Sequence, residues 1–158
     1  MLALAKILFQ LALGLWVGAI VFVSFVVAPT VFRVLPSETA GLVMGQIFPL
    51  YYGFTVAVGI VALGSALLLR RKVGGTGAWK VVVAMLVVML AATTYAGAVV
   101  NPKARALRPA LHQMPVDPEI RAQFDRLHRR AVQLNGLVLL LGVATIAVTA
   151  TNTRLPGE

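Results

Sequence analysis

The sequence contains no cysteine and few charged residues, and each shortage limits what the protein can be. Without cysteine the chain has no disulfide, no thiolate nucleophile and no thiolate-bound metal. Charged residues make up 12% of the 158 positions and hydrophobic residues 59%, whereas about 25% of an average soluble domain is charged. The composition therefore predicts one membrane domain, residues 1–158, in which lipid replaces part of a buried core.

Acidic residues are the scarcest charged type, and all five lie outside the long apolar segments. They are Glu38, Asp117, Glu119, Asp125 and Glu158. Because proton-driven pumps ordinarily keep an ionisable residue inside the membrane, the sequence disfavours that class. The 14 lysines and arginines give a net charge of +9 and cluster beside apolar segments. This pattern predicts contact with a bilayer that includes anionic lipids, and not with nucleic acid.

Four apolar segments are each close to the roughly 20 residues that cross a bilayer as a helix. Three lie at residues 7–28, 49–69 and 78–100, and the fourth is the later part of a helix predicted over residues 118–151. Pro29 is expected to kink the first helix, which then continues to Leu35. The predicted fold is an all-α membrane protein with four transmembrane helices, the fourth with a protruding start.

The segment between the first two spans predicts an additional, amphipathic helix. Its apolar residues recur at helical spacing: Ala40, Val43, Met44 and Ile47. Ser37 stands where an N-cap residue would. Pro49 is expected to end this helix, because the residue before a proline is pushed out of the α region. The helix would then be separate from the second span, lying at the membrane surface or packed into the bundle.

Polar and aromatic residues near the span ends on one membrane face are the binding candidates. The first and third loops emerge together in a four-helix topology, and the basic residues 101–117, with three prolines, are expected to form the third. The candidates are Arg33, Gln46, Phe48, Pro49, Tyr51, Asn101, Arg105, His128 and Asn135.

These candidates combine guanidinium, imidazole, amide and phenol groups, a mixture of donors and acceptors that suits a polar pocket. His128 and Asn135 are seven residues apart and therefore share one helix face. We expect seven of them to converge on one cavity at the mouth of the bundle: Arg33, Phe48, Pro49, Tyr51, Asn101 and His128, with Asn135 one or two turns deeper along the last helix. The alternative is that His128 and Arg33 only anchor their helices at the lipid head groups.

No catalytic residue and no metal site is predicted, and the sequence indicates no particular cofactor. Both histidines lie outside the predicted spans, and His112 has no third metal ligand beside it. Whether the protein is an enzyme is left open, with a non-enzymatic role favoured.

The sequence resembles the transmembrane protein 205-like family, whose bacterial members carry a domain of unknown function of the DUF4149 type. The similar features are densest over residues 22–52 and include Phe25, Phe32-Arg33, Leu35-Pro36, Gly41-Leu42-Val43 and Phe48-Pro49 followed by Tyr51. Two further motifs are similar as well: Asn101-Pro102 before Ala106, and Phe124-x-x-x-His128 before Asn135. The resemblance implies a multi-pass protein. An animal member is associated with resistance to platinum drugs, and no reaction or substrate is implied.

Three functional hypotheses remain. The first is a protein that binds or moves a small solute or a metal species. The second is a structural or assembly subunit, including a homo-oligomer, that packs through the Gly14/Gly18 and Gly41/Gly45 faces. The third is a membrane enzyme resembling small four-helix haem-pathway oxidases or copper-resistance proteins, which would need histidines inside the spans.

The short basic turn at Arg70-Arg71-Lys72 predicts the orientation, because such turns stay in the cytoplasm. We expect a bacterial inner-membrane protein with both termini cytoplasmic. Single cysteines placed at Gly75 and at Gln113 in intact cells should then react differently with an impermeant thiol reagent. Labelling at Gln113 alone is the expected result, and labelling at Gly75 alone would reverse the orientation.

Overall fold

The computed structural model describes residues 2–72, 77–111, 115 and 117–152, so Gly75, His112 and Gln113 lie outside the described residues. Every secondary-structure element in the described part is a helix. The first rod consists of α1 (Leu2–Phe22), the π-helical η1 (Val23–Val27) and α2 (Ala28–Val34). Next come α3 (Ser37–Lys72), the rod of α4 (Gly77–Tyr95), η2 (Ala96–Val100) and α5 (Asn101–Leu111), and finally α6 (Pro118–Asn152).

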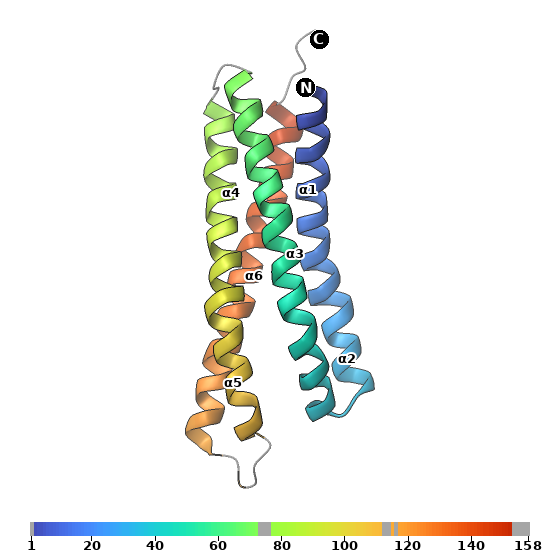
Figure 1. Ribbon diagram of the computed structural model, residues 1–158, viewed down its shortest axis with the longest axis vertical. Coiled ribbons are helices and arrows are strands. Elements are labelled where there is room, and N and C mark those ends of the chain that lie inside the picture. The colour runs from blue at the N-terminus through green and yellow to red at the C-terminus, as the bar shows by residue number, and fades with distance from the viewer. Residues whose placement is uncertain (1, 73–76, 112–114, 116, 153–158) are drawn as a thin grey trace.

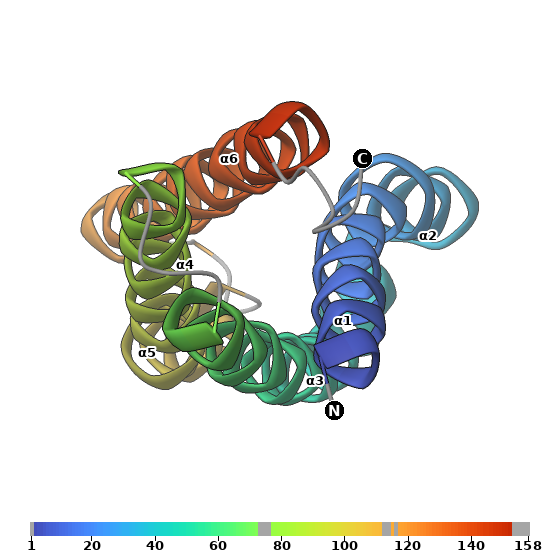
Figure 2. The same ribbon diagram turned by 90° about the horizontal axis from the view of Figure 1, so that it is seen from above.

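The four rods run alternately up and down, so the start of α1 and the end of α6 lie at the same end of the bundle (Figure 1). Seen from above, α1, α3, α4 and α6 follow one another around the bundle (Figure 2). Each rod is apolar enough to cross a membrane and contains 33 to 36 residues. Such helices are about 50 Å long and overhang a hydrocarbon core of about 30 Å. The predicted all-α fold with four transmembrane helices is confirmed.

The predicted end of a helix at Pro49 is wrong. Residues 37–48 are helical as expected, but α3 continues through Pro49 as one helix of 36 residues. Ala40 and Met44 before the proline and Tyr51 and Thr55 after it are all buried. Because these residues form one continuous stripe, packing against the neighbouring helices holds the two halves of α3 in line.

The predicted loop over residues 101–117 is also shorter than expected. Residues 101–111 form α5, which prolongs the third transmembrane helix past its predicted end at about Val100. Only the positions from 112 onward remain for the connection to α6, whose own start at Pro118 agrees with the sequence. The third helix therefore extends beyond the membrane as the fourth one does.

Both π-helical segments end two residues before a proline. Segment η1 precedes Pro29 and η2 precedes Pro102. A proline clashes with the carbonyl four residues earlier, and a π turn widens the helix at that point. The backbone N–H of Ala28 accordingly donates to Val23 O, and that of Asn101 to Ala96 O, each five residues back. The kink expected at Pro29 thus takes the form of a π turn.

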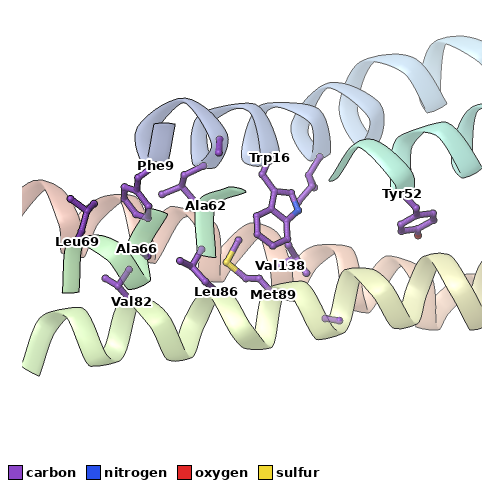
Figure 3. Close-up of a cluster of buried hydrophobic side chains, with 14 of the residues drawn as sticks. Phe9, Trp16, Tyr52, Ala62, Ala66, Leu69, Val82, Leu86, Met89 and Val138 are labelled. Carbon is purple, nitrogen blue, oxygen red and sulfur yellow. The ribbon is translucent and has the colours of Figure 1, made fainter. Parts of the chain in front are cut away.

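The tightest part of the core surrounds Trp16, which is completely buried. Its indole points from α1 toward Met89 of α4 and Val138 of α6 (Figure 3). On α3 the indole meets Gly59, where an added Cβ would lie 2.8 Å from Trp16 Cη2. In contrast, nothing lies within 4 Å of a Cβ built at Gly14 or Gly18. Helices α1 and α3 therefore approach each other at Gly59, and the Gly14/Gly18 pair makes no close helix contact within the described part of the chain.

This contact predicts that Gly59→Ala destabilises the protein. The methyl group would overlap the rigid indole, and overpacking of this kind costs about 1–3 kcal/mol. The matched control is Gly64→Ala on the same helix, where nothing lies within 4 Å of the new Cβ. Thermal unfolding in a neutral detergent should show a lower midpoint for Gly59→Ala only, and equal midpoints would contradict the close approach.

Candidate functional site

A cavity of about 630 Å³ lies between the helices at the end where α2 and α5 are found. This volume falls in the range of small-molecule sites, roughly 300–1,000 Å³. Most of the wall is apolar. The polar groups are few and come from four different elements: Ser24, Tyr52, Asn101, Arg108, His128 and Asn135. The site is thus an apolar chamber with a small number of hydrogen-bonding groups.

Four of the nine candidates predicted from sequence line this cavity: Phe48, Asn101, His128 and Asn135. A fifth, Tyr51, reaches it indirectly, because its hydroxyl donates a hydrogen bond of 3.4 Å to Asn135 Oδ1. The imidazole of His128 stacks on Phe124, with ring centroids 6.3 Å apart and an interplanar angle of 8°. Helices α3, α5 and α6 therefore bring together residues that are far apart in the sequence.

The other four candidates lie elsewhere. Pro49 and Arg105 line a separate groove, together with Tyr52, between α3 and the η2–α5 segment. Arg33 and Gln46 line neither space and are exposed. They sit on outward faces of α2 and α3, since a change of one position turns a side chain by about 100° around a helix. The structure does not gather all nine candidates into one cavity.

Arg108 of α5 is not among the candidates predicted from the sequence. Its side chain lies between α5 and α3. Its guanidinium packs on the Gly41/Gly45 face, and a Cβ at Gly45 would be 3.2 Å from Arg108 Nη1. Nε and Nη1 are buried, and neither has a hydrogen-bond partner among the described residues. Asn101, Ala104 and Arg108 share one helix face at spacings of three and four residues. This helical spacing could not be recognised while residues 101–117 were interpreted as a loop.

Three aromatic side chains of α3 form a cluster, of which Phe48 and Tyr52 line the cavity. The ring centroids of Tyr51 and Tyr52 are 5.0 Å apart, and that of Phe48 is 6.2 Å from Tyr52. Tyr52 fits against η2 because Gly97 has no side chain there; an added Cβ would be 2.7 Å from Tyr52 Cβ. The rigid aromatic cluster thus fixes the distance between α3 and the third helix at the level of the cavity.

The cavity opens sideways between the α2 end of the first rod and α6. Within the described part of the chain, α2 makes close backbone contacts with η1 and α3 but not with α5 or α6, and the lower end of α2 lies apart from α5 and α6 (Figure 1). Lining residues on both edges remain exposed: Phe25 to 67%, Phe32 to 51% and Val132 to 57%. In a multi-pass membrane protein, such apolar edges face lipid.

Comparison with known proteins gives a family and a relative. A family profile described as a domain of unknown function (DUF4149) matches residues 11–113. A protein of Aquifex aeolicus (strain VF5), described as uncharacterized, is 30% identical over 147 residues, which is 93% of this chain and 93% of that protein. No solved structure matches the chain significantly. The family match includes the cavity residues from Ile20 to Arg108.

The buried nitrogens of Arg108 predict that Arg108→Met stabilises the ligand-free protein. Methionine fills the same space without a charge, and a buried unsatisfied donor costs about 1–3 kcal/mol. Thermal unfolding in a neutral detergent should give a higher midpoint for this variant. Arg121→Met, at an exposed position of α6 outside both the cavity and the groove, should leave the midpoint unchanged. A lower midpoint for Arg108→Met would show that the guanidinium holds the fold together.

Proposed function

Because the chain belongs to the family described as a domain of unknown function (DUF4149), we propose its function from the cavity: this multi-pass membrane protein binds a small, mainly apolar solute between its helices. The observation that carries the proposal is the 630 Å³ chamber with its opening toward lipid. Apolar walls with a few convergent polar groups are typical of ligand sites. A solute dissolved in the bilayer would enter between α2 and α6.

The polar groups favour a solute over a metal species. Among the described residues, no three histidine or acidic side chains come together as a metal-binding cluster. His128 is accompanied in the cavity by amides, hydroxyls and Arg108, whose cation would repel a metal ion. The proposal concerns binding of the solute. Its movement across the membrane would be measured in a separate transport assay.

The short basic turn at Arg70-Arg71-Lys72 supports an orientation of the protein in its membrane. We propose the bacterial inner membrane with both termini in the cytoplasm, which puts the cavity at the opposite, extracytoplasmic end. The proposed resemblance to the transmembrane protein 205-like family agrees with a multi-pass architecture. It adds no ligand.

A second candidate role is a structural or assembly subunit. The observation that favours it is the outward position of the Gly14/Gly18 pair, with open space around both residues. Glycines four apart let a partner helix approach closely in a membrane. A second copy of the chain or another membrane protein would pack there, on a face distinct from the cavity.

Photolabelling with a small apolar aryl diazirine tests the binding proposal. The full chain in lipid nanodiscs should show saturable labelling of Leu127 and Leu139, which line the cavity. Labelling of Leu140, which is 71% exposed, should rise linearly with reagent. Ala131→Phe fills the cavity and should abolish the saturable component.

The matched control is Ala122→Phe, which adds the same ring at an exposed position of α6 outside the cavity. It should leave the labelling pattern unchanged. Linear labelling at Leu127 and Leu139, or labelling that Ala131→Phe does not affect, would show that the chamber is not a binding site.

A further inference from the structure

We infer that the cavity binds an anionic amphiphile, with its oxyanion head beside the Arg108 guanidinium and its apolar tail extending toward Ile20 and Leu139. This inference rests on the proposed function and names the class of solute. It is carried by three features of the described residues: the length of the cavity, the position of its one cation, and the side on which it opens.

The cavity is long in the direction of the membrane normal. On α6 its lining runs from Phe124 to Leu139, a distance of about 22 Å at 1.5 Å per residue. Half of a bilayer including its head groups is about 20–22 Å thick. The cavity therefore has the length of one lipid leaflet, which suits an extended acyl chain better than a compact solute.

Arg108 stands at the head-group end of this length. The predicted third span ends at Val100, near the edge of the hydrocarbon core, and Arg108 lies about two turns farther along. Side chains of a helix lean toward its N-terminus, which here directs the guanidinium back toward the membrane. At the other end the lining is apolar, with Ile20 and Leu139.

The charge at the polar end lacks compensation from the cavity wall. No aspartate or glutamate lines the cavity in the part of the chain that the structure describes. Two guanidinium nitrogens are shielded from solvent and have no hydrogen-bond partner among the described residues. An anion beside a partly buried cation is attracted more strongly than it would be in water. Asn101 and His128 add further donors at the same end.

The lateral opening determines how such a ligand arrives. Phe25 and Phe32 on one edge and Val132 on the other are exposed and apolar, so a tail can pass between them without leaving a hydrocarbon environment. The head then slides along the interface toward Arg108. A phosphate of a membrane lipid and a carboxylate of a free fatty acid share this chemistry, whereas inorganic phosphate lacks the tail.

Native mass spectrometry of the full chain in a neutral detergent tests the inference. The probes are dioleoyl phosphatidylglycerol, dioleoyl phosphatidylcholine, oleate and inorganic phosphate. We expect phosphatidylglycerol or oleate to bind about tenfold to a hundredfold more tightly than phosphatidylcholine, the range of a charge-assisted contact. The member of the pair that binds more tightly identifies the source of the head group. Inorganic phosphate should not displace it.

Arg108→Gln should remove this preference, and Arg108→Lys should retain part of it because the charge remains. Arg121→Gln, an exposed change of the same charge, should leave it intact. Equal binding of the anionic amphiphiles and phosphatidylcholine to the unaltered protein would overturn the inference. Displacement by inorganic phosphate, or a preference that survives Arg108→Gln, would overturn it as well.

The cavity-filling variant separates this inference from the proposed function. If Ala131→Phe abolishes binding of phosphatidylglycerol and phosphatidylcholine alike, and both bind equally well without it, the cavity binds a solute but does not select an anion. If Ala131→Phe leaves the binding of phosphatidylglycerol unchanged, the lipid is bound at another surface and this inference fails, whereas the proposed function stands or falls with the diazirine labelling of Leu127 and Leu139.

Discussion

Inside a bilayer each backbone N–H and C=O has to find its partner within the chain, because no water is available to replace it. A proline in a span removes one donor and crowds the carbonyl four residues earlier. At Pro29 and Pro102 the chain accommodates this with the π turns η1 and η2. Both segments contribute to the cavity wall, η1 with Ser24 and η2 with Val100. The cavity therefore lies where the π turns widen two of the helices and the helices pack less closely.

The four spans could be predicted from sequence because each depends on the summed apolarity of about 20 residues. Their ends could not, because a helix end depends on a local balance that packing decides. Pro49 was expected to stop a helix, yet Met44 and Tyr51 on either side are buried in one stripe of α3. The prolines within residues 101–117 favoured a loop, yet α5 packs against α6 and α3 over most of that segment. In both cases tertiary contacts outweighed the preference of a single residue.

The candidate site was predictable to the extent that it depends on membrane depth. Asn101, His128 and Asn135 were placed at the same end of the bundle by the alternation of the spans, and they do line one cavity. Which side of its helix a residue occupies is a finer property. Arg33 directly follows Phe32, which lines the cavity, but Arg33 faces outward. The sequence pattern predicts how deep a residue lies in the membrane more reliably than which side of its helix it occupies. The reason is that apolar residues here cover every face of a lipid-exposed helix.

Arg108 can be explained as a spacer or as a ligand-binding group, and the energetics separate the two. As a spacer it would fill the groove left by Gly41 and Gly45, which any long side chain does equally well. A methionine would do so without burying Nε and Nη1, which have no hydrogen-bond partner in the part of the chain that the structure describes. The charge is therefore the one property of Arg108 that packing does not require. A cation kept at that cost, in a chamber with no acidic lining residue among those described, is accounted for by an anion that enters from the bilayer.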